Sequence, residues 1–316
     1  MGENKITKTL MNRSRDSLLK YRKFLESIPL DEYRVELKDI KVVEQDLHPS
    51  LFPLPSIFES YWEKQNFFSF EDWFNKFWLE LSKEQKSAKK INEFKEVVSA
   101  HRKFYEDKIN NDLDKLFFTG FKARMYRTWV SVLTQLDFCY VCEYVRVKEG
   151  KNLTIECNAE LDAQGIDVKI NDIEFQIKKI TKRKEALRID SKKKIIILYT
   201  VFDIPEFERL SESPRVKDKQ GYKKALDAFH KYFILLQNGF VVFKEDYVKP
   251  IIDKIYSHEE VKKVVEKIVI GVGWRILIGG KQDAKSCNRR CGHNKIHAPC
   301  AGNEQRTRLG SNENGA

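Results

Sequence analysis

The chain has 316 residues, of which 41% are hydrophobic and 33% charged, a composition typical of a globular protein with a sizeable core. It has no apolar run long enough to cross a membrane, and Met1–Leu10 lacks the apolar stretch of a secretory signal, so we expect a cytoplasmic protein without a membrane partner. Lys and Arg outnumber Asp and Glu by 58 to 47, and this charge of +11 is typical of a nucleic-acid partner but also of a lysine-rich proteome.

The first third of the chain predicts helices. Apolar residues recur at helical spacing over Thr7–Ile28, and prolines then break the chain within Leu47–Ile57. Aromatic residues recur at three- and four-residue steps over Phe67–Leu81, a stripe that we interpret as core rather than as a surface for stacking bases. Lys83–Asn111 is predicted to be a solvated helix. We therefore expect a mainly helical region over residues 1–115 that packs on the core formed by the next part of the chain.

That next part, residues 116–280, predicts an α/β core. Leu113–Leu136 is helical, and Phe138–Val147 either completes that helix or begins a strand. Ile195–Phe202 is a continuous apolar run suited to the middle of a sheet. The other predicted strands are Asn152–Cys157, two within Gly165–Thr181, Phe240–Phe243 and Val269–Ile278, and the other helices are Tyr222–Leu236 and Tyr247–Lys267. This order of elements points to an α/β fold.

The last segment, residues 281–316, is poor in large aliphatic side chains, and we expect a disordered tail outside the fold. Its soft ligands are Cys287, Cys291, His293, His297 and Cys300. Four such ligands can hold zinc, but the spacing matches no standard zinc finger and no apolar residues flank it. Zinc binding stays the alternative to disorder.

Gly165–Lys179 is predicted to be a β-hairpin. Asn171 and Asp172 fit a two-residue turn, because both tolerate positive φ better than other non-glycine residues. Side chains alternate between the two sides of a strand, so this turn fixes which residues share a face. The apolar face then consists of Val168, Ile170, Ile173, Phe175 and Ile177.

The other face of this hairpin carries Asp167 opposite Gln176, with Lys178 one step along the strand. Cross-strand neighbours lie about 5 Å apart at Cβ. Two oxygen donors at that distance can hold Mg²⁺, and the backbone carbonyl of Ile177 would supply a further oxygen. The cation would polarise a phosphate oxygen and lower the pKa of a bound water. Lys178 would hold or deprotonate that water, or neutralise charge that grows on the phosphate.

The alternative to a catalytic site is an ordinary surface hairpin, with a solvated face and a Lys169–Glu174 pair. A catalytic site is favoured because Asp167, Gln176 and Lys178 occur together and a strongly cationic segment follows them. The segment 178–194 has nine cations against two acids, a local charge of +7. DNA carries one negative charge per roughly 1.7 Å of its axis, so a cationic segment beside a metal site would hold the DNA backbone.

The side chains that we expect to contact DNA are Lys179, Lys182, Arg183, Lys184 and Arg188, joined by Arg124 and Arg127 on the preceding helix. Phosphate contacts are the favoured use of these side chains, although Arg183 and Arg188 would also suit guanine. For Arg124 and Arg127 an ion pair on the helix surface is the alternative.

Asp167 followed by Gln176-Ile-Lys178 resembles the signature of PD-(D/E)XK nucleases, whose fold is a mixed central sheet flanked by helices. Gly-Ile-Asp stands where that family often has Pro-Asp, and Gln176 stands where an acid is usual. Because glutamine carries no charge, another acid is needed, and Glu160 and Asp162 just upstream are the candidates. Asp162 would then join Asp167, Gln176 and Ile177 as a metal ligand, whereas Glu174 is less suitable because its partner is Lys169.

A second resemblance covers about residues 20–200. Val43-Glu-Gln-Asp-Leu47, Pro-Leu-Pro at 53–55, Ala123–Trp129 and Leu133-Thr-Gln-Leu136 are similar to TaqI-type restriction endonucleases. This resemblance implies a type II enzyme that cuts double-stranded DNA at TCGA with Mg²⁺, with the region 1–115 contributing to DNA recognition. A palindromic target implies a homodimer by symmetry, and a cognate DNA methyltransferase is the expected further partner.

Two alternatives stay open. One is a repair or junction nuclease of the same fold. The other is a non-catalytic basic protein that binds nucleic acid and whose hairpin is structural. Three outcomes distinguish these functions. Cutting of plasmid DNA into discrete bands indicates a restriction enzyme, cutting of branched DNA alone indicates a repair or junction nuclease, and binding without cutting indicates a non-catalytic protein.

Overall fold

The fold is that of a computed structural model, which describes residues 2–30, 32–33, 53–84, 113–180, 186–189, 194–200, 204–271 and 275–278. All of these residues belong to one compact unit, Met1–Ile278. Its helices are α1 (Gly2–Ser27), α3 (Leu54–Phe58), the π-helix η2 (Glu59–Glu63), α4 (Phe70–Glu84), α6 (Leu113–Lys148), α7 (Ala159–Ala163), α8 (Ile204–Glu212), α9 (Lys219–Tyr232), α10 (Glu245–Asp253) and α11 (His258–Gly271). Its strands are β1 (Ile155–Glu156), β2 (Val168–Ile170), β3 (Ile173–Ile180), β4 (Ala186–Ile189), β5 (Lys194–Thr200), β6 (Phe233–Leu235), β7 (Val241–Phe243) and β8 (Arg275–Ile278).

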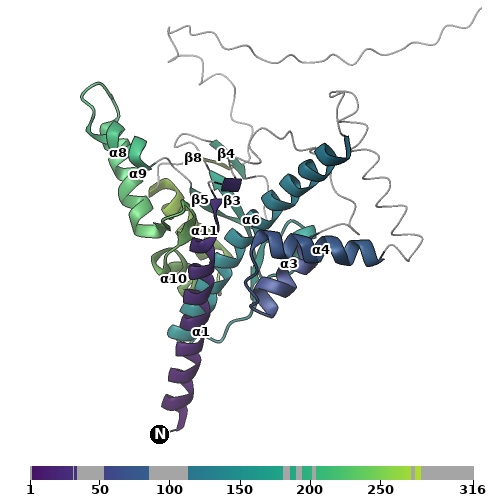
Figure 1. Cartoon of the computed structure of the whole chain (residues 1–316). Coiled ribbons are helices and arrows are strands. Elements are labelled where there is room, and N and C mark those ends of the chain that lie inside the picture. The colour runs from purple at the N-terminus through teal and green to yellow at the C-terminus, as the bar shows by residue number, and fades with distance from the viewer. Residues whose placement is uncertain are drawn as a thin grey trace, which may run out of the picture. The chain divides into compact units, whose positions relative to one another are not determined.

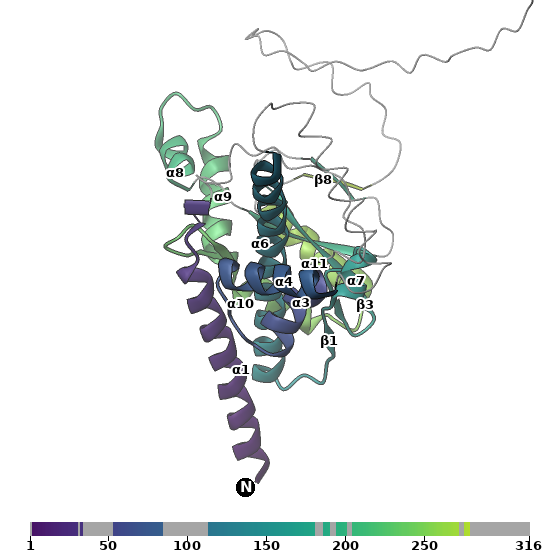
Figure 2. The ribbon, with the colours of Figure 1, turned by 45° about the vertical axis from the view of Figure 1, so that its right-hand side comes forward.

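Helix α6 connects the helical first part of the chain with the sheet (Figures 1 and 2). It is 36 residues long and contacts α1, α3, α4, α10, β1 and β7. Phe138–Val147, for which the sequence left helix and strand open, continues this helix. Every residue from Val132 to Cys142 is buried, so this stretch lacks the one-sided apolar pattern by which a surface helix is recognised. The boundary expected near residue 115 falls inside the helix.

A four-stranded mixed sheet, in the order β1-β2-β3-β5, packs beside α6. The first three strands are antiparallel and β5 pairs with β3 in parallel. Sheet and helices together confirm the predicted α/β class. Strand β5 is the apolar run expected in the middle of a sheet, but it lies at the end of the described sheet. It is apolar nonetheless because α11 and β7 contact it.

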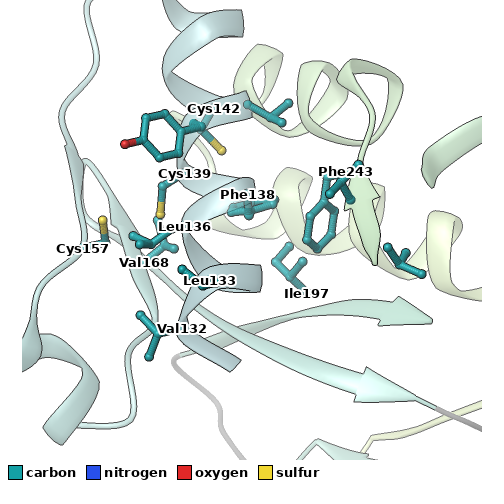
Figure 3. Packing of buried hydrophobic residues seen from close by; sticks show 14 of the residues in the cluster. Val132, Leu133, Leu136, Phe138, Cys139, Cys142, Cys157, Val168, Ile197 and Phe243 are labelled. Carbon is teal, nitrogen blue, oxygen red and sulfur yellow. The ribbon is translucent and has the colours of Figure 1, made fainter. Parts of the chain in front are cut away.

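The register of the β2–β3 hairpin is the predicted one. Val168 pairs with Phe175 and Ile170 with Ile173, and Asn171 in the turn has a φ of +51°. The predicted apolar face is buried, and Ile177 at its end is half-buried against the core. Figure 3 shows how residues of α6, among them Leu133 and Leu136, face the sheet. The hairpin is therefore anchored by its apolar face. On its other face Lys169, Glu174, Gln176 and Lys178 are half-buried.

The aromatic stripe of α4 belongs to the core, as predicted. Phe70, Trp73, Phe74 and Phe77 are each at most 6% exposed. Phe70 lies 5.4 Å from Trp129 of α6, measured between ring centroids. Aromatic packing of this kind explains how the short helices after residue 53 are held on α6.

Several predicted boundaries differ from the structure. The helix predicted over Tyr222–Leu236 ends at Tyr232, because Phe233 turns to an extended φ of −133° and begins strand β6, which pairs with β7. The strand predicted over Val269–Ile278 begins only at Arg275, since Val269–Gly271 completes α11. In both cases apolar residues continue across the junction, so hydrophobicity alone does not mark where one element ends.

An ion pair inside the fold joins α1 to α6 and β7. Arg22 Nε donates to Asp137 Oδ1 at 3.1 Å, and Phe243 N donates to Asp137 Oδ2 at 2.7 Å. Arg22 also donates to the carbonyl oxygen of Phe243. Burial raises the pKa of Asp137, and the Arg22 guanidinium opposes that rise.

Arg22→Leu is expected to lower the free energy of unfolding by about 3 kcal/mol or more, because it leaves the fully buried Asp137 carboxylate without its counter-ion. Urea denaturation measures this loss. The double variant Arg22→Leu/Asp137→Asn is the control, since it removes the charge as well and is expected to recover part of the stability. Equal stability of the single variant and the unmodified protein would contradict the role of the pair.

Parts of the predictions fall outside the described residues. These are most of the solvated helix Lys83–Asn111, the resemblance segment 43–47 and the whole tail 281–316. Among the helices of the described ranges, none is long and apolar enough to cross a membrane.

Candidate functional site

The loop before the hairpin is built by a capped helix of one turn. Asn158 caps α7 at its N-terminus, where its side-chain oxygen accepts from Leu161 N at 2.9 Å. At the other end Gly165 N donates to Asp162 O at 2.7 Å, and Ile166 N donates to Leu161 O at 2.9 Å. This is the Schellman arrangement, in which a residue with positive φ ends the helix, and Gly165 has a φ of +70°. The chain then enters β2 directly after the following aspartate.

Gly165→Ala is expected to lower the free energy of unfolding by about 1–2 kcal/mol, because an L-residue is strained at this φ. Its Cβ would also lie 3.3 Å from Lys194 Nζ, so this ammonium, whose charge acts on Asp167, would have to move by a few tenths of an ångström. Gly150→Ala is the matched control, since Gly150 has a φ of +61° and nothing within 4 Å of an added Cβ. Thermal unfolding should show similar losses for both, and any activity that depends on the site should fall only for Gly165→Ala.

Asp167 is buried at the start of the hairpin, with 7% of its surface exposed. The β2–β3 ladder ends at Val168, and Asp167 N donates to Phe175 O at 2.9 Å instead of continuing the register. The predicted cross-strand pair of Asp167 with Gln176 is therefore wrong as a ladder pair. The physical reason is that the Asp167 carboxylate takes the place of a backbone partner: Ile177 N donates to Asp167 Oδ2 at 2.5 Å.

Burial raises the pKa of Asp167 to about 6. The N–H of Ile177 acts against that rise, and so do the positive charges of Lys178 and Lys194, whereas the charge of Asp162 adds to it. The electrostatics thus bring together Asp162, Asp167 and Lys178, three of the side chains that the sequence singled out.

The other acid of this group is Asp162, on α7. Burial raises its pKa as well, and Gln135 Nε2 of α6 donates to Asp162 Oδ2 at 3.4 Å. Glu160 lies on the same short helix but is exposed, and its charge is not among the influences on Asp167. Of the two upstream acids, Asp162 is therefore the one that lies with Asp167.

Gln176 lies on the same side as the Gly165 turn. Its Nε2 would be 3.9 Å from a Cβ at Gly165, close to the place where Lys194 Nζ donates to Gln164 O at 2.5 Å. The Ile177 carbonyl points to the same edge of β3 as its N–H, because the two groups of one residue in a strand face the same neighbour. The carbonyl oxygen therefore faces the edge at which Asp167 lies.

Three residues around Asp162 and Asp167 were not expected in the site from the sequence. Gln135 and Tyr199 come from the apolar stretches of α6 and β5, and Lys194 begins β5. Burial raises the pKa of Tyr199, and the negative charge of Asp167 raises it further. The signal that could have found Gln135 is a polar side chain inside an otherwise apolar helical run.

The chain is similar to known restriction enzymes over most of its length. The family model of the TaqI restriction endonuclease matches residues 18–255. The type II restriction enzyme TaqI of Thermus aquaticus is 35% identical over 254 residues, which cover 76% of this chain and 88% of that enzyme. The type II restriction enzyme TthHB8I of Thermus thermophilus is 33% identical over 244 residues, 72% of this chain and 84% of that enzyme.

This chain belongs to the TaqI restriction endonuclease family. The resemblance expected from the sequence is thereby confirmed, and the family is one of site-specific endonucleases that act on DNA. The matched span includes Gln135, Asp162, Asp167 and Lys178 but not the Cys/His segment 287–300. No solved structure matches the chain.

For this member of the TaqI family, the described residues contain no group of three or more His, Cys, Asp or Glu side chains placed to hold a metal. Asp162 and Asp167 are two carboxylates, and Gln176 and the Ile177 carbonyl are neutral oxygen donors. All four are hard oxygen ligands, which suit Mg²⁺ and not a soft metal. The donor set thus fits Mg²⁺ in kind, with a net charge of −2.

The DNA-contact candidates are only partly described. Lys179 and Arg127 are exposed, as a phosphate contact requires. Arg124 is half-buried, and its Nε is buried without a hydrogen-bond partner among the described residues. Lys182, Arg183, Lys184 and the side chain of Arg188 lie outside the described residues.

A cavity of about 470 Å³ opens elsewhere in the fold. It is lined by residues of α1, by Trp62 of η2 and Gln65 just after it, by the last turns of α6 from Tyr140 to Val147, and by Gly150 and Lys151 just beyond α6. None of its lining residues comes from the hairpin, so this cavity is separate from the Asp167 site.

Proposed function

We propose that this protein is a type II restriction endonuclease that hydrolyses phosphodiester bonds of double-stranded DNA with Mg²⁺, from a site on a PD-(D/E)XK core. The observation that carries the proposal is the buried Asp167, with one carboxylate oxygen on Ile177 N and with Asp162 and Lys178 in electrostatic reach. A buried acid with a raised pKa beside a second acid and a lysine is unfavourable for stability and typical of a functional site. Membership of the TaqI family supports cleavage of DNA as the chemistry of that site.

The residues that would hold Mg²⁺ are Asp167, Asp162, Gln176 and the carbonyl of Ile177. The bound cation would polarise a phosphate oxygen and lower the pKa of a bound water. Glu160 remains a candidate for a more distant contribution, through water or through the charge of the site. Its exposed position on α7 makes it secondary to Asp162.

Lys178 follows Gln176 by two residues and therefore projects from the same face of β3. From there its ammonium acts on Asp167 and would reach a phosphate held beside it. It would hold or deprotonate the attacking water, or neutralise charge that grows on the phosphate in the transition state. Water is the nucleophile, and no covalent intermediate with the protein forms.

Cationic side chains around this site would hold the DNA backbone. Lys179 and Arg127 support this proposal by their exposure, and Lys182, Arg183, Lys184, Arg188 and Arg124 complete the proposed set. Contacts of this kind are electrostatic, so binding should weaken steeply with salt.

The proposed target is the palindrome TCGA, as the resemblance to TaqI-type enzymes implies. A palindrome is read most simply by two copies of the same chain related by a twofold axis, so we propose a homodimer. A cognate DNA methyltransferase would protect the same sequence in the cytoplasm of the host cell.

The test is digestion of a DNA of known sequence with Mg²⁺ and with EDTA in its place, followed by mapping of the ends. Discrete fragments with ends at TCGA support the proposal as it stands, and discrete fragments at another sequence replace only the target. Cutting restricted to branched or damaged DNA supports a repair or junction nuclease instead. Salt-sensitive binding without cutting under any divalent cation would leave a non-catalytic DNA-binding protein.

A further inference from the structure

We infer that Gln135 is a positioning residue of the proposed nuclease site, which holds the Asp162 carboxylate in place beside Asp167. This inference rests on the proposed function and adds to it a residue from helix α6, outside the hairpin and its loop. The contact that carries it is the hydrogen bond from Gln135 Nε2 to Asp162 Oδ2, at 3.4 Å.

A glutamine at position 135 does not make the folded state more stable. The residue is 7% exposed, within a stretch of α6 that is buried from Val132 to Cys142. Its Oε1 is buried without a hydrogen-bond partner in the part of the chain that the structure describes. A buried amide oxygen without a donor destabilises the folded state, and an apolar side chain of the same length would avoid that penalty. What the glutamine provides at this position is therefore its Nε2 group, which donates to Asp162.

Asp162 needs such a tether. It lies on α7, a helix of five residues whose neighbours Glu160 and Ala163 are exposed, so its carboxylate has open solvent close by. The like charge of Asp167 repels it, as the effect of Asp162 on the Asp167 pKa shows. Without the Gln135 amide, both influences favour turning Asp162 outward. With it, one oxygen is held toward α6 and the carboxylate stays in the site.

A neutral donor is the suitable one here. Lysine or arginine in place of Gln135 would also hold Asp162, but would neutralise its charge and compete with a cation. The amide orients the carboxylate and leaves the net charge of the Asp162–Asp167 pair at −2. This charge matters more than usual because Gln176 stands where a third acid would add to it.

The test compares Gln135→Met with the matched control Leu136→Met, the next buried residue on α6. The readout is the rise in melting temperature on titration with Mg²⁺ alone, together with the Mg²⁺ dependence of DNA cleavage. For Gln135→Met we expect a melting temperature without Mg²⁺ no lower than that of the unmodified protein. The Mg²⁺ concentration for half the effect should rise roughly 10- to 100-fold, as for other residues that orient a ligand. Leu136→Met should leave the Mg²⁺ response unchanged.

A double-mutant cycle with Asp162→Asn tests whether Gln135 acts through Asp162. If it does, Gln135→Met has no further effect on the Mg²⁺ titration once Asp162 is asparagine. Gln135→Asn keeps the amide but withdraws it by one methylene, and it serves if Gln135→Met does not fold. Additive effects, or a loss of stability with an unchanged Mg²⁺ response, would overturn the role of Gln135 alone. Absence of any Mg²⁺ effect in the unmodified protein would overturn the proposed function together with it.

Discussion

Asp167→Asn is expected to abolish cleavage of DNA and, above pH 6, to make the fold more stable. Asparagine has nearly the same shape, and its side-chain oxygen can still accept from Ile177 N, so the hairpin should keep its structure. The negative charge is lost, and with it the strongest ligand proposed for Mg²⁺. Residues that merely support a ligand lower metal affinity or activity roughly 10- to 100-fold, so the loss of the ligand itself should exceed about 100-fold.

The gain in stability follows from the raised pKa. An aspartate has an ordinary pKa of 3.8, which burial raises to about 6 in the folded protein. Between those values the folded state binds more protons than the unfolded state, so the free energy of unfolding falls as the pH rises from about 4 to about 6. A difference of roughly two pKa units corresponds to about 3 kcal/mol in the free energy of unfolding. The folded protein has lost all of this stability once the pH is above 6. Asp167→Asn removes this loss.

The measurement is urea denaturation of both proteins between pH 4 and pH 8, in EDTA. Their stabilities should converge near pH 4, separate between pH 4 and pH 6, and stay apart by a constant amount above pH 6, with the variant the more stable. Mg²⁺ should restore part of the stability of the unmodified protein and none of that of the variant. Asp172→Asn, at the exposed turn of the same hairpin, is the control and should change neither cleavage nor the pH profile. A parallel pH profile for Asp167→Asn would contradict the burial of an ionised carboxylate.

The hairpin could be predicted from the sequence because one of its faces is buried. A slip of one residue would have turned Val168 and Phe175 into solvent, so the apolar alternation allowed only one register with Asn171 and Asp172 in the turn. Alternation does not predict where the pairing of β2 with β3 ends. Whether Asp167 continues the pairing or accepts from Ile177 N depends on where the chain enters from α7, and alternation says nothing about that.

The acid that accompanies Asp167 shows the same limit. The sequence placed Glu160 and Asp162 two residues apart just before the hairpin and could not choose between them. In a helix of a single turn, two residues apart means different faces, and no apolar periodicity is long enough to show which face is inward. The capping hydrogen bonds at Asn158 and Gly165 fix the two ends of α7. The hydrogen bond from Gln135 then shows that Asp162 is the acid that faces α6.

Gln135 was missed because helix α6 is buried all round in that stretch. When every position faces the interior, the periodic contrast between apolar and polar faces disappears, and a single polar residue gives no sign of what it faces. Its partner Asp162 lies 27 residues further along the chain. Only the packing of α6 against the sheet, which depends on contacts such as Phe138 with Phe175, brings the two together.

Lys178→Ala is expected to lower the rate of DNA cleavage roughly 100- to 10,000-fold while leaving DNA binding largely intact. The ammonium acts on the Asp167 carboxylate, so it lies where a phosphate would meet the site. Its removal takes away one charge from a strongly cationic surface, which changes binding little. Cleavage depends on the Lys178 charge because this ammonium lies beside the proposed site of hydrolysis. Single-turnover cleavage rates and DNA affinity, measured separately, test both halves of the prediction.

Lys178→Arg separates the roles that this lysine could have. Arginine keeps the positive charge but cannot deprotonate, so it would retain part of the rate if Lys178 neutralises charge on the phosphate, and would behave as alanine if Lys178 deprotonates water. Lys169→Ala is the matched control, because Lys169 pairs with Glu174 on the same face of the hairpin and takes no part in the proposed chemistry. If Lys169→Ala slowed cleavage as much as Lys178→Ala, the effect would belong to the charge of the whole face. If only Lys178 matters, the catalytic ammonium is fixed by the same alternation along β3 that buries Ile173 and Phe175.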